Sequence, residues 1–514
     1  MEGGQWLRNS ITMVGAKMQS PAFGVTPSRR SWVFAAALST IFMAAMEGTI
    51  VATAMPTIVG SLGGFDLFSW VFSAYLLAQA TTIPIYGRLA DIYGRKRIVF
   101  LGIGLFLAGS VLCGFAWNMI SLIAFRILQG IGSGALIPVA QTIVGDLYSG
   151  EDRARMQGYV SSVFGSAAIL GPTIGSLLVA HVHWSMVFWI NVPLGIIAGV
   201  MLAVTFNEQA QKRPHRIDYL GSALMVLGSA TFMFALVQAP SFSISVIIGL
   251  IGISLALLAV LFIYERRTPE PMLPLELFRI RVIAVGNVVG LANGAMMMGI
   301  VAFLPAYMLG ALQSSTSIAA LALAAMAGAW PVGGLIGSRI ILLSSYRVAG
   351  TIGSLVLLAG SLAMIALDPI LGPAWPIAGA LLVGFGIGVT NICFVIAVQA
   401  AVDKNQRGTA TASLSFTRIL GQSLGTAIFG GIFNIGLSGH ILGGTDIVVQ
   451  MMQPSLRAAI TVTEIKAAVE AFTQSLHNVY LVNGLLALVV LAAVRSLPAG
   501  LKLVRSKEKA EAVP

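Results

Sequence analysis

The stretch "GRLADIYGRKR" at residues 87–97 concentrates charge in a short segment between two long apolar runs. It holds one acid, Asp91, and the basic run Arg95–Arg97. Charged side chains are excluded from the hydrocarbon core of a bilayer, and basic residues collect in the turns on one side of it. The stretch is therefore typical of a turn between two membrane-spanning helices.

The composition of the whole chain also indicates a membrane protein. Of 514 residues, 57% are hydrophobic and only 10% are charged, whereas a soluble domain usually carries about 25% charged residues. The net charge of +11 does not indicate nucleic-acid binding, because the basic residues lie in short turns rather than on one solvated face. The two cysteines, Cys113 and Cys393, lie inside predicted spans and form no disulfide or metal-binding pattern.

Apolar runs of about 20 residues, the length that a helix needs to cross a bilayer, recur along the chain. We predict an all-α integral membrane protein with fourteen transmembrane helices. The predicted spans are 32–57, 67–87, 98–117, 119–144, 156–180, 184–206, 217–238, 243–263, 281–309, 316–340, 347–367, 374–400, 410–437 and 477–497.

The predicted spans group into two six-helix bundles, which are pseudo-repeats, with two extra central helices between them. The predicted parts are an N-terminal tail at 1–31, a bundle at 32–206, two linker helices at 217–263, a bundle at 281–497 with an outer loop at 438–476, and a C-terminal tail at 498–514. In the outer loop, "TVTEIKAAVEAF" has a capping-box spacing from Thr461 to Glu464. It predicts a short amphipathic helix, with a passive linker as the alternative.

Repeated motifs support the two bundles. "RILQGIGSG" at 126–134 and "LVGFGIG" at 382–388 each hold three glycines at alternate positions. "PIYGRLAD" at 84–91 is echoed weakly by "PVGGLIGS" at 331–338, where Ser338 stands in the place of Asp91. Two similar halves with inserted helices fit a transporter built from repeats.

The basic residues also predict the orientation. Turns after even-numbered spans are rich in Lys and Arg, whereas the short turns after odd-numbered spans contain none. Since basic turns face the cytoplasm, both termini are expected there, in a multi-pass protein of the inner, or cytoplasmic, membrane.

The opening stretch can also carry chemistry. Gly87 permits close helix packing, and Asp91 can stabilise a helix N-terminus or pair with Arg95 or Arg97. Together with Gly94, these residues are candidates for a cytoplasmic latch that holds two halves together and releases as they rock. The alternative is that the charges only anchor the topology, which leaves the acid and the glycines unexplained.

Glu47 is the only acid predicted at mid-membrane, and an ionisable residue at that depth is a functional candidate. Arg126 in the fourth span is expected at the same depth, since both residues lie roughly 12–15 Å below the outer surface at about 1.5 Å per residue. A carboxylate removed from water tends to hold a proton, and a nearby arginine favours its release. The pair is a candidate proton switch, and a static structural pair is the alternative.

Other polar residues at membrane depth are candidates for lining a cavity. They are Asn287, Asn293, Met297, Asn391, Gln399 and Arg418. Arg418 can pair with a lipid phosphate, a carbonyl group or the substrate, and the sequence does not choose among them. The "HVH" segment at 181–183 lacks a third ligand and lies at an expected membrane interface, so no metal site is predicted.

Several of these motifs resemble those of a known family. "GRLADIYGRKR" closely resembles the loop signature of the major facilitator superfamily. "GSAAILGPTIGS" at 165–176 resembles the fifth-span signature of its antiporter branch at Gly165, Gly171, Pro172 and Gly175, although Ser176 stands where the family has a second glycine.

Two further motifs narrow the resemblance. "EGTIVATAMP" at 47–56 is similar to the first-span signature of fourteen-span drug:proton antiporters of the EmrB/QacA type, with Glu47 where Asp is usual. "RILQGIGSG" is similar to the fourth-span signature, including Arg126. The resemblance covers residues 32–497. It implies a secondary transporter that exports amphiphilic compounds by alternating access, driven by proton entry.

We therefore expect a proton-coupled exporter of amphiphilic drugs or other toxic small molecules. The first alternative is a transporter of the same fold for one narrow physiological substrate, such as a lipid, siderophore, antibiotic or metabolite. An enzyme would need a clustered nucleophile and base or a metal set, and an ATP-driven pump would need a phosphate-binding motif; the sequence offers neither. Expected partners are substrate, protons and membrane lipids, with no cofactor, no metal and no nucleic acid, and a periplasmic adaptor in a two-membrane bacterium.

Overall fold

The computed structural model describes residues 27–63, 67–148, 150–208, 218–238, 242–268, 275–438 and 462–497, and all regular elements in these ranges are helices. The long helices are α2 (Pro27–Leu62), α3 (Phe68–Tyr93), α4 (Arg95–Gly114), α5 (Met119–Leu147), α6 (Gly150–His181), α8 (Asn191–Thr205), α9 (Tyr219–Val237), α10 (Ile244–Glu265), α11 (Arg281–Gly310), α12 (Thr316–Leu343), α13 (Tyr346–Ile365), α14 (Ala374–Ala401), α15 (Arg407–Ser438) and α18 (Val462–Arg495). The short ones are α7 (Met186–Trp189) and the 3₁₀ turns η2 (Leu275–Arg279), η3 (Pro369–Leu371) and η4 (Lys404–Gln406).

Twelve helices within the described ranges are long and apolar enough to cross a membrane. Helices α3 and α15, 26 and 32 residues long, are not among the twelve. Both carry polar side chains along their length, such as Gln79 and Thr82 in α3 and Arg418 and Gln422 in α15, which lower their mean hydropathy. The predicted count of fourteen spans and the two extra central helices are therefore not confirmed.

Helix ends follow local sequence signals. The Asn118 side chain accepts a hydrogen bond from the Ser121 amide at 2.8 Å and begins α5, and Asp218 caps α9 through the Gly221 amide at 2.7 Å. Gly94 separates α3 from α4 with φ of +94°, a backbone conformation that favours glycine. The short turn places α3 and α4 side by side.

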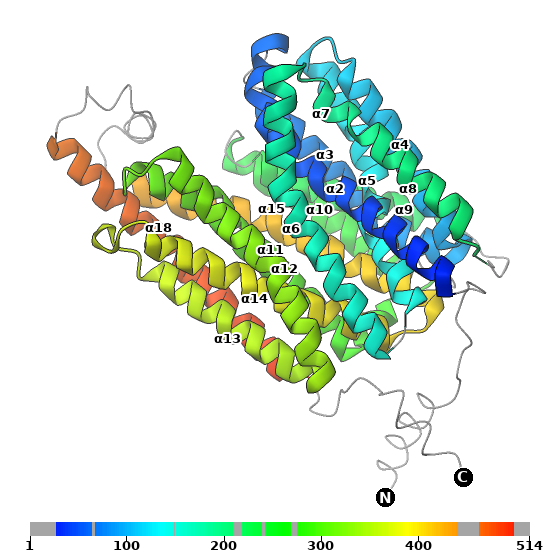
Figure 1. Cartoon of the computed structure of the whole chain (residues 1–514). Coiled ribbons are helices and arrows are strands. Elements are labelled where there is room, and N and C mark those ends of the chain that lie inside the picture. Colours follow the sequence, from blue (N-terminus) through cyan, green and yellow to red (C-terminus); the bar gives the residue numbers. More distant parts are fainter. Residues whose placement is uncertain are drawn as a thin grey trace, which may run out of the picture.

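The described helices form two groups that meet along one zone (Figure 1). One group, α2 to α8, has its own buried apolar clusters, and the other, α11 to α18, has a single large one. A small cluster joins the groups: Ala80 and Ile83 of α3, Ala412 and Ile419 of α15, and Met233 of α9. Helix α9 therefore packs at the junction of the halves, with α10 against it.

The two glycine motifs have matching packing partners in the two halves. In α5, Gly130 and Gly134 face α3, and Gly132 faces α4. In α14, the first and third motif glycines, Gly384 and Gly388, face α12, and the middle one faces α13. The same glycine spacing thus produces the same close helix contacts twice, as a repeat requires.

The last helix differs from the sequence expectation. The segment predicted as a short amphipathic helix before a span at 477–497 is the beginning of one continuous helix, α18, that starts at Val462. A helix does begin at this position, but no break separates the predicted short helix from the span that follows it. Thr461, the predicted cap, lies outside the described residues. The predicted tails at 1–31 and 498–514 and the outer loop up to residue 461 lie largely outside the described residues.

Two helix pairs make the most extensive contacts between the halves, and both contacts lie toward the end of the bundle that carries the α3–α4 turn, which we call the latch end. Helix α3 packs on α15, where Gly87 lies against Gly408 and Ala412. Helix α6 packs antiparallel on α12, where Gly158 meets Ser338 and Gly165 meets Pro331.

The halves separate beyond these contacts. A Cβ added at Gly328, one turn past Pro331 on α12, would meet no atom within 4 Å. Ala324, one further turn along α12, is exposed, as is Ile169 on α6. Along α6 and α12, the halves are thus in close contact toward the latch end and apart beyond Pro331.

Candidate functional site

The predicted latch residue Asp91 binds the other half of the molecule. It lies at the end of α3 and accepts hydrogen bonds from the backbone amides of Gly408 and Thr409, at 2.9 and 2.8 Å, and from the Thr409 hydroxyl at 2.9 Å. These amides are the first of α15, where unpaired N–H groups and the helix dipole favour a carboxylate. Asp91 therefore caps a helix of the opposite half.

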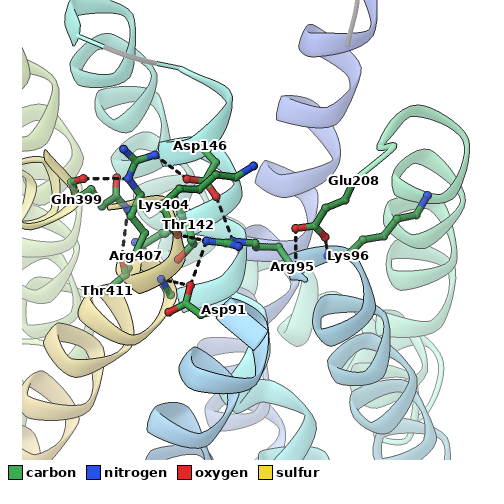
Figure 2. A network of polar contacts seen from close by, with 12 residues as sticks. Asp91, Arg95, Lys96, Thr142, Asp146, Glu208, Gln399, Lys404, Arg407 and Thr411 are labelled. Atoms are coloured by element: carbon green, nitrogen blue, oxygen red, sulfur yellow. Dashed lines mark hydrogen bonds and ion pairs between the residues drawn. The ribbon is translucent and has the colours of Figure 1, made fainter. Parts of the chain in front are cut away.

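Ion pairs extend this contact (Figure 2). Arg95 contacts Asp91 and Asp146, each at 3.1 Å, and donates a hydrogen bond to the Lys404 carbonyl. Asp146, at the end of α5, also pairs with Arg407 of α15 at 2.7 Å. Three of these side chains are almost completely buried, so the pairs are poorly screened by water. We call Asp91, Arg95, Asp146 and Arg407 the latch network.

Gln399 strengthens the same junction. It was predicted to line a cavity, but the structure places it against the latch network. Its side-chain amide donates to the Gln141 carbonyl at 3.2 Å, its side-chain oxygen accepts from Gln157 at 3.1 Å, and its backbone carbonyl accepts from Arg407 at 3.0 Å. A Cβ on Gly145 would overlap the end of this side chain, so a larger residue there would force Gln399 to move. Helical periodicity could not reveal this, because Gln141 and Gln157 are 258 and 242 residues away in sequence.

Glu208 is a structural residue that the sequence reasoning missed. It accepts hydrogen bonds from the backbone amides of Arg95 and Lys96, at 3.0 and 2.7 Å, and so caps α4 (Figure 2). A Cβ at Gly94 would collide with this carboxylate. An acid directly after an apolar span was the available signal.

The other latch candidates have different surroundings. Gly87 allows α3 and α15 to approach, as the preceding section describes. Arg97 is exposed, and no ion pair joins it to the described residues. Asp91 therefore pairs with Arg95 and not with Arg97. Lys404 lies in the η4 turn beside this network, and burial lowers the pKa of its amine.

Glu47 and Arg126 are in contact, at the shared depth that the sequence predicted. The Arg126 Nη1 atom contacts the Glu47 Oε1 atom, and both side chains are fully buried. The guanidinium also donates to the Val71 carbonyl at 3.2 Å and lies 4.1 Å from the centre of the Tyr75 ring. The pair lies wholly within the first half, between α2, α3 and α5.

Two amide side chains that the sequence reasoning missed complete the pair. Asn191 donates to the second Glu47 oxygen at 2.6 Å, and Gln129 accepts from Arg126 at 2.7 Å. Gln129 in turn donates to Ser110 at 2.7 Å. Each is the single amide side chain in an apolar run, and this pattern could have identified it as a polar residue at membrane depth. Both Glu47 oxygens are thus hydrogen-bonded, so a proton on either oxygen would disturb a contact to another helix, α5 or α8.

The fifth-span motif packs against the helix that carries Glu47. Gly171 and Gly175 of α6 lie against Thr49 and Thr53 of α2, and the Thr49 hydroxyl donates to the Ala167 carbonyl of α6 at 3.2 Å. Pro172 lies inside α6 without ending it. The motif therefore joins α2 closely to α6, a helix of the inter-half contact.

Of the remaining cavity candidates, some are buried and bonded to neighbouring helices, and others are half-buried. Asn287 donates to Ser413 at 3.2 Å and Asn293 donates to Thr390 at 2.9 Å, so both fasten α11 within its own half. Met297 accepts a weak contact from Gln422 at 3.6 Å, and Asn391 is half-buried. Arg418 is half-buried and its guanidinium carbon lies 6.0 Å from the centre of the Trp330 ring.

The ranges that the structure describes contain no cluster of three or more His, Cys, Asp or Glu side chains that could hold a metal ion. His183 contacts the Ser185 hydroxyl at 3.1 Å. Both cysteines are buried and unpaired with each other.

Comparisons with known proteins agree with this architecture. The family model described as Major Facilitator Superfamily matches residues 37–426. The chain is 32% identical to the multidrug transporter protein MdtP of Bacillus subtilis, over 87% of this chain and 83% of that protein. It is 35% identical to multidrug resistance protein 3 of the same organism, over 76% of this chain and 77% of that one.

Solved structures show the same fold. The transporter FucP, crystallised in an outward conformation, aligns with a TM-score of 0.61 over 90% of this chain and 97% of its own, at 15% identity. Proteins of this family are membrane transporters of small molecules and not enzymes. From its helices, its motifs and these matches, the chain belongs to the Major Facilitator Superfamily.

Proposed function

We propose that the chain is a proton-coupled secondary transporter of the fourteen-span EmrB/QacA type, which exports amphiphilic drugs or other toxic small molecules by alternating access. Relatives named as multidrug transporters, at 32% and 35% identity, support this substrate class. In this proposal no ATP or cofactor takes part, and the proton gradient supplies the energy.

The proposal places all fourteen long helices across the membrane, with the latch end at the cytoplasm. Helices α3 and α15 can span despite their polar residues, because they pack against each other and α3 also packs on α9. A polar residue at membrane depth is tolerated when it faces protein and not lipid. The basic run Arg95–Arg97 at the latch end supports the orientation.

The observation that carries the proton coupling is the buried pair of Glu47 and Arg126. Neutralising Glu47 would leave Arg126 buried without its carboxylate, which is costly in a low-dielectric interior. Proton binding is therefore expected to move Arg126 and the helices that it holds. Since Thr49 joins the same helix to α6, such a movement can reach the contact between α6 and α12.

The test uses purified protein in liposomes with an imposed pH gradient and a panel of cationic, neutral and anionic dyes. Glu47→Gln removes the titratable proton at nearly the same volume and is expected to abolish uphill transport. Glu47→Asp is expected to keep part of the activity. Glu470→Gln, at an exposed glutamate of α18, serves as the control and is expected to transport normally.

Proton movement gives the decisive reading. Wild-type protein is expected to release or take up protons when substrate is added, and Glu47→Gln is not. If Glu47→Gln moves protons as the wild type does, Glu47 does not couple transport to protons. A pair that is only structural would lower the thermal stability of Glu47→Gln while leaving its proton movement unchanged.

A further inference from the structure

We infer that Arg418 and Trp330 form a recognition site for organic anions, so that the transporter accepts amphiphiles with an acidic group and a flat apolar body. This inference rests on the proposed function and adds a substrate class to it. The side chains come from α15 and α12 of the second half.

Arg418 lacks the carboxylate partner that comparable arginines have. The Arg95, Arg126 and Arg407 side chains each contact a carboxylate. No acid of the described residues pairs with Arg418, and its Nε atom is buried without a hydrogen-bond partner. Because removing a cation from water without a partner is unfavourable, this position is suited to a group that binds from outside the chain.

The backbone holds Arg418 in place. A Cβ at Gly294 of α11 would collide with the Arg418 carbonyl, and one at Gly290 would lie 3.9 Å from its amide nitrogen. This close approach of α11 to α15 fixes the point from which the Arg418 side chain extends.

Aromatic rings provide an apolar surface beside the cation. Trp330 stacks on Phe164 of α6 with ring centres 6.4 Å apart and planes at 11°. The guanidinium of Arg418 lies over the same indole ring at 6.0 Å. An arginine beside an aromatic face recognises a planar anion through both charge and stacking.

The position within the fold suits a transported ligand. Trp330 adjoins Pro331, at the last close contact between α6 and α12, and the helices separate from Gly328 onward. The site therefore lies where the two halves part, and its Trp330–Phe164 stack includes a residue from each half. A ligand at this point would contact both halves and sense their relative movement.

The ligand test compares pyrenebutyrate with its methyl ester, which share the aromatic body and differ in charge. Binding to the full-length protein in phosphatidylcholine nanodiscs is measured by fluorescence anisotropy, with empty nanodiscs subtracted. Arg418→Gln is expected to weaken binding of the acid by about tenfold or more, because a charged pair is lost. Binding of the ester is expected to change by less than about twofold. Arg418→Lys is expected to retain only part of the acid affinity, because lysine keeps the charge but lacks the planar group that stacks on the ring.

The control variant is Arg267→Gln, at an exposed arginine at the end of α10, which is expected to bind both probes as the wild type does. Equal weakening of acid and ester by Arg418→Gln, or no weakening of the acid, would overturn the inference. Monodispersity and thermal unfolding are recorded for each variant, and the acid-to-ester ratio of each folded variant is the quantity compared.

A second arm distinguishes a substrate from a lipid headgroup. Nanodiscs that contain phosphatidylglycerol are expected to leave acid binding unchanged. If phosphatidylglycerol displaces the acid from the wild type, Arg418 holds a lipid phosphate and the substrate assignment is wrong. The inference also fails separately from the proposed function, because gradient-driven transport of a cationic dye does not depend on selectivity for the acid over the ester.

Discussion

The two contacts between the halves have similar packing but different charge. The α3–α15 contact brings Gly87 against Gly408 and then adds Asp91, which caps α15. The α6–α12 contact brings Gly165 against Pro331 and Gly158 against Ser338, and these pairs involve no charged side chain. Since Ser338 stands in the repeat position of Asp91, the sequence departs from the repeat at a residue that binds across the junction.

This difference indicates that the halves are fastened unequally. Packing of small residues allows close approach and needs no particular donor geometry, so helices can slide at such a contact. A carboxylate on two helix amides and an arginine fits one arrangement only. Opening of the latch end would therefore have to break the α3–α15 contact together with the Asp146–Arg407 ion pair, whereas the α6–α12 contact can act as a pivot.

Replacing the charged residue of the α3–α15 contact should have the largest effect on transport. Asp91→Asn loses the charge that binds the two amides and Arg95, at an expected cost of about 1.5–3 kcal/mol to the closed latch. Transport is expected to fall by about tenfold or more. Hydrogen–deuterium exchange should accelerate at the amides of Gly408 and Thr409, while insertion and folding remain.

The matched variant is Ser338→Ala, which removes the hydroxyl at the corresponding position of the other contact. That hydroxyl bonds only within its own helix, to the Leu335 carbonyl at 2.8 Å. Ser338→Ala should change transport by less than about twofold, because the expected loss of stability is within about 0.5 kcal/mol. If Asp91→Asn transports at the wild-type rate, the charges only anchor the topology and the two contacts are equivalent.

Enlarging a glycine should affect both contacts to a similar extent. A Cβ at Gly87 would overlap Ala412, and one at Gly165 would overlap the Pro331 ring. Gly87→Ala and Gly165→Ala are each expected to destabilise the protein by about 1–3 kcal/mol, because the helices must move apart. Thermal unfolding in one detergent measures this.

Gly328→Ala is the control for these variants, since its Cβ meets no atom within 4 Å. It is expected to unfold at the wild-type temperature or slightly above, because alanine favours a helix over glycine. If only one of Gly87→Ala and Gly165→Ala lowers the thermal stability strongly, the two contacts differ in packing as well as in charge.

The smallest expected effect belongs to Arg97. Its side chain is exposed and lies outside the latch network, so Arg97→Ala removes a basic residue from the turn but no ion pair with the part of the chain that the structure describes. We expect transport to fall in the same direction as for Asp91→Asn, but by less than about twofold. A tenfold loss, measured in the same liposome assay, would place Arg97 in the latch.

The sequence alone determined where the helices lie and which residues carry charge into them. Hydrophobic length is a local property, so the apolar runs correctly located α2, α4 and α5, and the helical rise correctly placed Glu47 beside Arg126. It also identified Asp91 as an acid that a role in anchoring the topology does not explain. The two glycine motifs were visible as a repeat because the same glycine spacing allows the same close helix contacts in each half.

Only the tertiary structure decided which charges meet. Asp146 and Arg407 are 261 residues apart, Gln399 reaches Gln141 across the junction of the halves, and Arg418 lacks a carboxylate partner among the described residues. A hydropathy pattern is one-dimensional and records whether a residue is apolar, not which helix it faces. Partners for buried charges are set by the rotation and approach of whole helices, and these depend on contacts along the entire chain.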